Sequence, residues 1–265
     1  MESFKGKSVW ITGASAGLGR ELALAFAREG AHLTLSARRE ERLTEVAREV
    51  EVAGGRAFVA ALDVTDEAAT TAVAQAIAQR EGGLDVAIAN AGFAVTGPFE
   101  DLDAAAWRRQ FEVNVFGLTI TARAALPHLR ARRGRLALIG SVAGMIPGPA
   151  AAPYSASKAA VRSIARSLAV ELHGTGVSCT GIYPGFVESE IGRVDNAGDF
   201  DAARKDKRPA SLLWPADRAA KVMLHAIRRR RREFTFTAHG RLAGFLGRHA
   251  PWLVHYALCR VQKKR

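Results

Sequence analysis

Short apolar runs alternate with longer segments of helical periodicity along most of this chain. The runs have the length of buried strands and fall at 8–12, 32–37, 56–62, 85–89, 135–139, 177–183 and 233–237. Between them, apolar residues recur at helical spacing within 22–30, 40–53, 67–81, 103–132, 159–172 and 215–230. Strands that alternate with helices imply right-handed crossovers, so the pattern predicts an α/β fold with a doubly wound parallel sheet and helices on both faces.

Two stretches depart from this alternation. Within 103–132, Asn114 is a poor helix former that either faces solvent or has a specific role, and Pro127 is expected to bend or end the helix. After the run 177–183, the segment 186–212 is polar, rich in charge and without a clear period. We expect it to be a mobile substrate loop, because long irregular segments in compact domains are commonly functional.

The composition fits one large domain over residues 1–265, since 48% of the residues are hydrophobic and 24% are charged. Cys179 and Cys259 offer neither a disulfide framework nor metal-ligand spacing, so we expect no metal site, and a cytoplasmic setting fits. Cys179 lies in an apolar run and is expected to be a core residue rather than a nucleophile. We expect neither a secretory signal nor a membrane span, because no apolar stretch has the form of one or the length of the other.

The chain is strongly basic, with a formal net charge of +12. The excess is partly local, in the arginine run 228–232 and in the terminal segment 263–265. Such a field attracts phosphorylated cofactors or acidic lipids. Nucleic acid is disfavoured as a partner, because the sequence has no reading motif and no aromatic residues interleaved with the basic run. The run 228–232 is most simply a solvated helix end, where cations also complement the helix dipole.

Residues 238–265 form a basic amphipathic extension, which we expect to be one or two short helices broken by Pro251. Amphipathic faces usually pack against protein, so we expect this one to cover the domain, a second subunit or the substrate cleft. The alternative is peripheral contact with a membrane, because basic helices that carry Trp and Tyr can lie in the interface. The apolar side chains are Leu242, Phe245, Leu246, Trp252, Leu253, Tyr256 and Val261, and the cations include Arg241, Arg248, Arg260 and Lys263.

A glycine-rich segment directly follows the first strand. Residues 12–19 read T-G-x-x-x-G-x-G between an apolar run and a helix, which is the context in which such a loop binds a dinucleotide rather than forming a purely structural turn. Glycines allow a tight turn and a close approach to a pyrophosphate, whose charge then lies at the helix N-terminus. The predicted cofactor contacts in this loop are Gly13, Ser15, Gly17, Leu18 and Gly19.

The ends of the next strands carry further candidate contacts. The strand 32–37 ends at Arg38 and Arg39 rather than at an acidic residue. An acidic residue would hold ribose hydroxyls, whereas an arginine accommodates a 2′-phosphate, so the sequence favours NADP(H) over NAD(H). The alternative is a pair of solvated arginines at a helix start. The other predicted contacts at strand ends are Asp63, Val64, Asn90, Ala91 and Gly92.

Tyr154 and Lys158 lie four residues apart at the start of a helix. This spacing places both side chains on one face, one turn apart. The pKa of a free phenol is about 10, and a neighbouring ammonium lowers it, so the tyrosine could serve as a general acid and base. An isolated pair of this kind is more often a core-edge tyrosine and a solvated lysine. Ser141 favours the catalytic interpretation, because it lies at the carboxyl end of the strand 135–139.

Taken in order, these motifs resemble the short-chain dehydrogenase/reductase family over roughly residues 5–237. The resemblance rests on the loop 12–19, Asn90-Ala91-Gly92, Asn114, Ser141, Tyr154-x-x-x-Lys158 and Pro184-Gly185. It implies a Rossmann-like sheet of about seven strands and an NADP(H)-dependent oxidoreductase that interconverts a ketone or aldehyde and an alcohol. The apolar tail suggests an apolar substrate. Self-association as a homodimer or homotetramer is implied through helices near 103–132 and 154–173.

The resemblance gives each matching residue a role. Tyr154 would exchange a proton with the substrate oxygen, and Ser141 would hydrogen-bond that oxygen. Lys158 would lower the pKa of Tyr154 and hold the nicotinamide ribose, and Asn114 would anchor a water that links Lys158 to solvent. The residues that match positions around the nicotinamide are Pro184, Gly185, Val187 and Ser189, of which the last two would contact its amide.

The chain departs from the family pattern at Ala16, Ala89 and Ser189. Members that prefer NADP often have a second basic residue at the position of Ala16, so the cofactor preference depends on Arg38 and Arg39. The substrate, direction, stereochemistry and oligomeric order do not follow from the sequence. The alternative function is a non-catalytic, cofactor-binding regulatory protein or a membrane-peripheral scaffold, against which the complete catalytic set argues.

Overall fold

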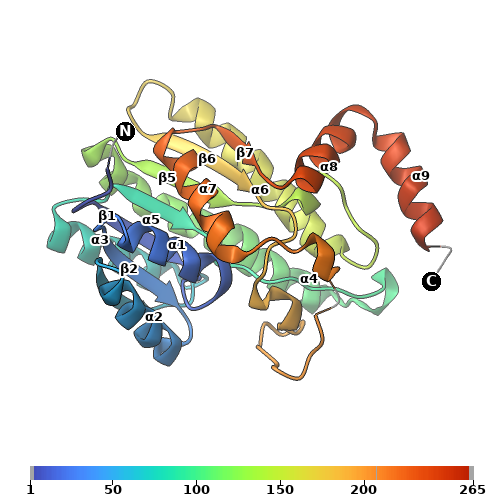
Figure 1. The fold of residues 1–265 in the computed structure, drawn as a ribbon, viewed down its shortest axis with the longest axis horizontal. Coiled ribbons are helices and arrows are strands. Elements are labelled where there is room, and N and C mark those ends of the chain that lie inside the picture. The colour runs from blue at the N-terminus through green and yellow to red at the C-terminus, as the bar shows by residue number, and fades with distance from the viewer. Residues whose placement is uncertain (1–2, 207, 263–265) are drawn as a thin grey trace.

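The structure of the chain is a computed structural model that describes residues 3–206 and 208–262. Its seven strands all run parallel in one sheet, with the spatial order β3-β2-β1-β4-β5-β6-β7 (Figure 1). Each predicted strand is present within two residues of its predicted bounds. The strands are β1 (Ser8–Thr12), β2 (His32–Ala37), β3 (Arg56–Ala61), β4 (Val86–Ala89), β5 (Arg135–Ile139), β6 (Ser178–Tyr183) and β7 (Glu233–Thr235).

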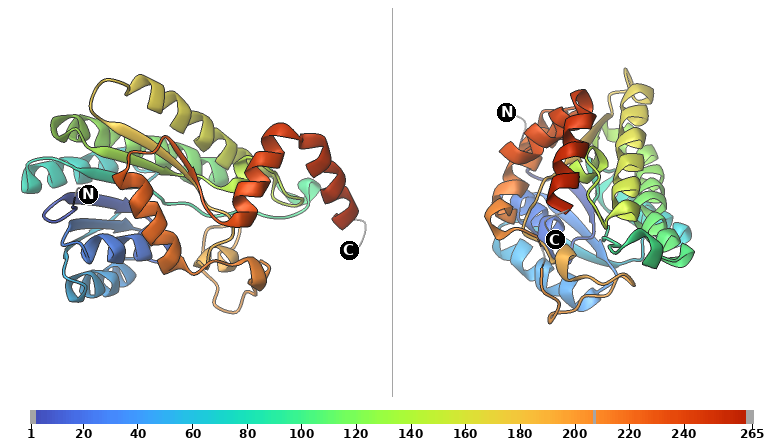
Figure 2. Two further views of the ribbon diagram at one scale, coloured as in Figure 1. Left: turned by 45° about the horizontal axis from the view of Figure 1, so that its top comes forward. Right: turned by 90° about the vertical axis from the view of Figure 1, so that its right-hand side faces the viewer.

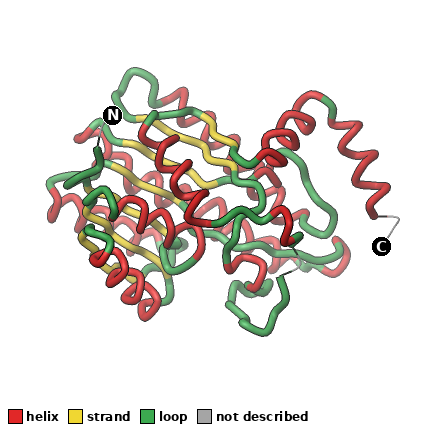
Figure 3. The backbone as a smooth tube through the Cα atoms, in the orientation of Figure 1, coloured by secondary structure: helices red, strands yellow, loops and turns green. Residues whose placement is uncertain are grey.

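Helices cover both faces of this sheet, as Figure 3 shows with yellow strands between red helices. One face is covered by α1 (Gly17–Ala27), α2 (Glu40–Val52) and α7 (Ala216–Arg228). The other is covered by α3 (Glu67–Glu81), α5 (Leu118–Arg132) and α6 (Ala152–Glu171), and α4 (Ala104–Phe111) packs on α6. The predicted doubly wound α/β fold is therefore confirmed.

The strands are apolar on both faces because each face is buried under helices. In β1, Val9 and Ile11 pack under α1 and α2, whereas Trp10 points to the core under α3 and α5. Trp10 satisfies its indole N–H within the sheet, since Nε1 donates to Ser36 Oγ at 3.0 Å. The alternation of side chains along a strand thus divides the core into two layers.

The segment 103–132 is not one continuous α-helix. A π-helical turn, η2 (Glu112–Gly117), separates α4 from α5 and contains the buried Asn114. Of the two expectations for Pro127, that it bends or ends the helix, the second is wrong, because α5 continues to Arg132. Ala125 and Leu129 on either side of the proline are fully buried, and this packing holds the helix together where proline removes a hydrogen bond.

The chain after β7 forms two helices, α8 (Ala238–His249) and α9 (Pro251–Gln262), so the predicted break at Pro251 is confirmed. Helix α8 packs on β7 and on the short turn η3 (Val142–Gly144), whereas α9 makes its main contacts with α8. Figures 1 and 2 show α9 projecting away from the sheet. Residues 263–265 lie outside the described residues, and no described helix is long and apolar enough to cross a membrane.

Candidate active site

A cavity of about 1350 Å³ lies at the carboxyl ends of the strands and collects the predicted site residues. Only Gly19 and Asn114 of that set do not line it. Both lie behind its wall, as described below. The predicted residues that do line it are Gly13, Ser15, Gly17, Leu18, Arg38, Arg39, Asp63, Val64, Asn90, Ala91, Gly92, Ser141, Tyr154, Lys158, Pro184, Gly185, Val187 and Ser189.

The glycine loop between β1 and α1 leaves no room for a side chain at its three glycine positions. Gly13 has a φ of 66°, and a Cβ on it would lie 2.8 Å from Ala91 Cα. Gly17 has a φ of 53°, and its Cβ would lie 3.0 Å from Ser189 Cβ. Gly19 has a different task, because its missing Cβ allows α1 to pack directly on the carbonyl of Gly13. These are the turn and the close approach that a pyrophosphate-binding loop requires.

The N-terminus of α1 opens toward this loop without a capping side chain. Its N-cap, Ala16, makes no side-chain hydrogen bond, and the first turn carries no acidic residue. The first N–H groups of the helix and the positive end of its dipole are therefore available to an anion. The loop and the helix start together fit the diphosphate of a dinucleotide.

Asn90 ties the end of β4 to the end of β1. Its Nδ2 donates to the carbonyl oxygens of Thr12 at 3.0 Å and of Gly13 at 3.1 Å, and its backbone N–H donates to Thr12 Oγ1 at 3.1 Å. Asn90 therefore shapes the glycine loop from behind as well as lining the cavity. Next to it, a Cβ on Gly92 would lie 2.9 Å from Asn114 Oδ1, which explains the small residue there.

Arg38 and Arg39 enter the cavity from the end of β2. The Arg38 guanidinium donates to the carbonyl of Gly198, and Arg39 donates to Glu190 Oε2 at 2.7 Å. Arg39 also lies 5.6 Å from the centre of the Phe200 ring. Both arginines thus connect β2 to the segment 186–212, although Arg38 is also exposed to solvent and Arg39 is the N-cap of α2.

The predicted catalytic cluster is assembled by β5 and α6. Tyr154 and Lys158 lie on the first turns of α6, and the Tyr154 side chain is hydrogen-bonded to Ser141, which follows β5. Lys158 is 5% exposed, and its Nζ donates to the carbonyl of Ile139 at 2.9 Å. The same Nζ lies 5.9 Å from the centre of the Tyr154 ring. Hydroxyl, phenol and ammonium therefore meet at one place in the cavity wall.

The electrostatics of this cluster differ from expectation. Burial raises the pKa of Tyr154 above its ordinary value, and the Ser141 hydrogen bond and the charge of Arg208 only partly oppose this. The predicted lowering of that pKa by Lys158 is wrong, because the ammonium is directed to the carbonyl of Ile139. Burial without a counter-charge lowers the pKa of Lys158 itself to about 8. In this arrangement Tyr154 is a protonated phenol at neutral pH.

Asn114 supports the cluster from behind the cavity wall. Its Nδ2 donates to the carbonyl of Phe93 and to Ser157 Oγ, at 3.0 and 3.1 Å, and its Oδ1 accepts from the Phe93 N–H at 3.0 Å. All these partners are protein groups, so Asn114 links the segment after β4 to α6. The π-helical turn directs this polar side chain inward, and such turns are frequent at functional sites.

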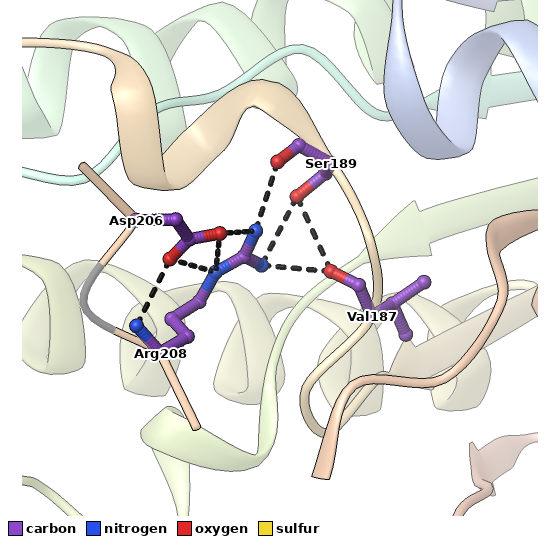
Figure 4. A network of polar contacts seen from close by, with 4 residues as sticks. All are labelled: Val187, Ser189, Asp206 and Arg208. Carbon is purple, nitrogen blue, oxygen red and sulfur yellow. Dashed lines mark hydrogen bonds and ion pairs between the residues drawn. The ribbon is translucent and has the colours of Figure 1, made fainter. Parts of the chain in front are cut away.

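Arg208 is a site residue that sequence reasoning missed. Its guanidinium donates to the carbonyl oxygens of Val187 at 2.7 Å and Ser189 at 2.8 Å, and to Ser189 Oγ at 3.2 Å (Figure 4). Asp206 pairs with the same group at 2.7 Å, and this pairing lowers the pKa of Asp206. Arg208 therefore fixes the cavity wall after β6. No local pattern indicated it, because its partners depend on how an irregular segment folds back.

Other side chains complete the cavity or lie outside it. Arg109, Glu190, Arg204 and His239 line it and were not predicted, and Ala243 of α8 and Leu258 of α9 extend its wall to the tail. Cys179 is buried in the core, as predicted, and burial raises its pKa to about 12, which leaves it unreactive. The described residues contain no group of three or more His, Cys, Asp or Glu side chains that could hold a metal ion.

Comparison with known proteins gives a consistent result. The sequence model of the family described as short chain dehydrogenase matches residues 7–199. The sulfoacetaldehyde reductase 2 of Chromohalobacter salexigens is 39% identical over 207 residues, which are 76% of this chain and 82% of that protein. An 11-beta-hydroxysteroid dehydrogenase A of Sesamum indicum is 35% identical over 235 residues, 86% of this chain and 67% of that protein.

A further relative, a short chain dehydrogenase of Pseudocercospora fijiensis, is 38% identical over 198 residues. The match covers 73% of this chain but only 63% of that protein, so the chain spans less than two thirds of this relative. Among solved structures, a short chain dehydrogenase/reductase of Burkholderia phymatum in complex with NAD superposes with a TM-score of 0.80 and 27% identity. This superposition covers 89% of the present chain and 90% of the other.

The buried ammonium of Lys158 predicts a specific dependence of stability on pH. Unfolded lysine titrates near 10.5 and the folded one near about 8, so between these values the unfolded chain binds more protons and the folded state gains stability as pH rises. Each unit of pKa difference corresponds to about 1.4 kcal/mol. The free energy of unfolding of wild type, relative to that of Lys158→Met, should therefore increase by about 3 kcal/mol between about pH 7 and pH 10.5. Urea unfolding measures this difference, in which changes common to both proteins cancel.

The matched control for this measurement is Lys221→Met, at a lysine of α7 that is exposed and paired with Asp217. It should show no comparable gain. A difference between wild type and Lys158→Met that stays constant with pH would contradict the burial of a charged group at Lys158.

Proposed function

This chain belongs to the short-chain dehydrogenase family and is an oxidoreductase, and on that premise we propose that it interconverts a ketone or aldehyde and an alcohol by hydride transfer with NADP(H). The observation that carries the proposal is the meeting of Tyr154, Ser141 and Lys158 at the wall of a cavity that also contains the glycine loop. When bound, NADP(H) supplies or accepts the hydride. The residues of the chain bind it, orient the substrate and move the proton.

The residues around the glycine loop fit a nicotinamide dinucleotide. Gly13 and Gly17 allow the tight turn that leads to the open N-terminus of α1, where a diphosphate would bind, and Asp63 and Val64 line the cavity as candidate contacts of the adenine. The Burkholderia protein holds NAD, which supports the cofactor class. For this chain, the preference for NADP(H) is supported by Arg38, since a guanidinium pairs with phosphate by charge-assisted hydrogen bonds.

In this proposal Ser141 and Tyr154 both act on the substrate oxygen, in different roles. The Ser141 hydroxyl, already within hydrogen-bond reach of Tyr154, orients that oxygen and stabilises the charge that develops on it. The Tyr154 hydroxyl donates its proton during reduction and accepts one during oxidation. With its pKa raised, Tyr154 is protonated at neutral pH, which is the form that reduction requires.

Lys158 and Asn114 act as positioning residues in this scheme. Lys158, anchored on the carbonyl of Ile139, is proposed to hold the nicotinamide ribose. Asn114 fixes the strand-end segment at Phe93 and the helix at Ser157, so that the wall between them keeps its shape. Its predicted role as the anchor of a water remains a prediction, as do the contacts of Val187 and Ser189 with the nicotinamide amide.

The substrate is proposed to be apolar. The names of the Chromohalobacter and Sesamum relatives point to substrates as different as a sulfonated aldehyde and a steroid. Sequence similarity alone therefore does not identify the substrate class. The cavity wall beyond the catalytic cluster favours the apolar class. Its side chains there include Val142, Ile146, Phe186, Leu212 and Leu258.

Self-association and location remain predictions. Exposed Phe116 and Val170 lie on the helical segments through which a homodimer or homotetramer is predicted to form. A cytoplasmic location rests on the sequence argument alone. The alternative function, a regulatory or scaffold protein that binds the cofactor without turnover, differs from the proposal in what it requires of Tyr154.

Replacing Tyr154 by Phe tests the proposed chemistry. Phe keeps the ring but removes the proton that reaches the substrate oxygen, so kcat should fall by about two to four orders of magnitude. NADPH binding, measured by fluorescence titration, should stay within about twofold of wild type because the cofactor cradle is untouched. Turnover that is equal in Tyr154→Phe and wild type would remove Tyr154 from the reaction. Cofactor binding without turnover in both proteins would favour the scaffold alternative.

Arg38→Ala tests the cofactor preference. Loss of a charge-assisted contact with the 2′-phosphate should weaken NADPH binding by about 10- to 100-fold and leave NADH binding nearly unchanged. Arg42→Ala is the matched control, since Arg42 is an exposed arginine of α2 that pairs with Glu45 outside the cavity. If the ratio of the two affinities is the same in Arg38→Ala and Arg42→Ala, the preference has another origin.

Arg208→Gln tests whether this guanidinium acts on Tyr154. The charge of Arg208 lowers the pKa of Tyr154, so its removal should raise that pKa and move the alkaline limb of kcat/KM for carbonyl reduction, which requires the protonated phenol, to higher pH. Arg204→Gln, on the same segment and also lining the cavity, is the control and should leave the limb in place. A lower rate with an unshifted pH profile in Arg208→Gln would assign Arg208 to the shape of the wall alone.

A further inference from the structure

The C-terminal hairpin, residues 238–262, carries positive charge and no acidic side chain. The last acidic residue of the chain is Glu233, and the six cations that follow residue 238 are Arg241, Arg248, Arg260, Lys263, Lys264 and Arg265. Arg248 lies 3.4 Å from Glu233, and Arg260 lies 4.4 Å from the centre of the Tyr256 ring. Because the Glu233 carboxylate neutralises only one of these cations, the remaining positive charge can attract an anionic partner.

Large apolar side chains of the hairpin are exposed to solvent. Trp252 is 71% exposed, Leu242 and Phe245 are each 60% exposed, and Tyr256 is 52% exposed. Single exposed apolar residues are ordinary in soluble proteins, but four of them on two adjacent helices indicate an interaction surface. Of the alternatives predicted for this face, packing on the domain does not apply to these four side chains.

The way in which α8 packs explains this exposure. A Cβ on Gly240 would lie 3.2 Å from Val142 Cγ2, one on Gly244 would lie 3.0 Å from Met145 Sδ, and one on Gly247 would lie 2.7 Å from the Met145 carbonyl oxygen. Glycines at this helical spacing form the side of α8 that contacts the body of the protein. Leu242 and Phe245 are on the opposite side of the helix and therefore point outward.

The exposed surface borders the cavity. Ala243 of α8 and Leu258 of α9 line the cavity wall, next to the turns that carry Leu242 and Tyr256. Anything that covers the hairpin therefore lies beside the cavity mouth. Figure 2 shows the two helices as a projecting ridge at one end of the molecule.

We propose that this hairpin docks on an anionic phospholipid surface and lies in the bilayer interface. Trp252 and Tyr256 are the amphipathic rings that favour the headgroup level, and Leu242 and Phe245 supply the apolar side that enters the acyl boundary. The arginines and the terminal lysines pair with acidic headgroups. The helices lie on the surface and do not span it, since no described helix is long and apolar enough to cross a membrane.

A second copy of the chain fits this surface less well. A twofold contact would bring identical hairpins together, and with no acidic side chain between residues 238 and 265 their cations would face each other. The net charge of +12 on each chain also opposes contact of the hairpin with the rest of a neighbour. Single-stranded nucleic acid binds in basic grooves, whereas this surface is a ridge.

Co-sedimentation of the full chain with vesicles tests the proposal. Phosphatidylcholine vesicles with about one quarter phosphatidylglycerol should bind wild type about tenfold more tightly than pure phosphatidylcholine vesicles, and salt should weaken this binding. Phe245→Glu with Trp252→Glu should reduce binding to the anionic vesicles at least about tenfold. The matched control is Val52→Glu with Phe99→Glu, which removes two exposed apolar side chains elsewhere and adds the same charge.

The control should retain most of the binding, and circular dichroism should show both double variants folded. Equal binding of the hairpin variant and wild type would overturn the proposal. So would sedimentation velocity that shows wild type as an oligomer dissociated by the hairpin variant, since the surface would then be a subunit interface. Competition by a single-stranded RNA oligonucleotide that also loses affinity in the hairpin variant would assign the surface to nucleic acid instead.

Discussion

Parallel pairing of all seven strands is the constraint on which the site depends. Because the strands point the same way, their carboxyl ends meet at one edge, and segments that begin at Gly13, Asn90, Ser141 and Pro184 gather there. The helices between the strands bury the sheet on both faces, which leaves that edge as the place where polar side chains can collect. Helix α6 then brings Tyr154 and Lys158 next to Ser141.

Much of this arrangement could be predicted from short-range patterns. Apolar runs located the strands, and the four-residue spacing of Tyr154 and Lys158 placed both on one face of a helix, since such patterns depend only on local geometry. The direction of the Lys158 ammonium was not predictable, because it depends on the carbonyl of Ile139 at another strand end. The role of Arg208 in the site was not predictable for the same reason, since its partners Val187 and Ser189 lie about twenty residues away across an irregular segment.

The positive charge of the chain is distributed in a way that composition did not indicate. Inside the cavity, Arg39 pairs with Glu190 and Arg208 pairs with Asp206, so part of the charge there is neutralised by the same segment that forms the wall. On the projecting tail the cations have almost no acidic neighbours. Basic residues of the chain therefore lie in two different environments: some pair with carboxylates in the cavity wall, and others lie on a tail that has no acidic residue.

The π-helical turn at residues 112–117 makes the site sensitive to chain length as well as to residue type. A π-turn accommodates one residue more than an α-helical turn, and each residue of an α-helix advances the direction of the next side chain by about 100°. Deleting a single residue between α4 and α5 would let the helix become regular and would rotate the Asn114 amide away from Phe93 and Ser157. Related chains that lack this surplus residue must therefore fix the wall behind the lysine by some other means, however similar the rest of their sequence.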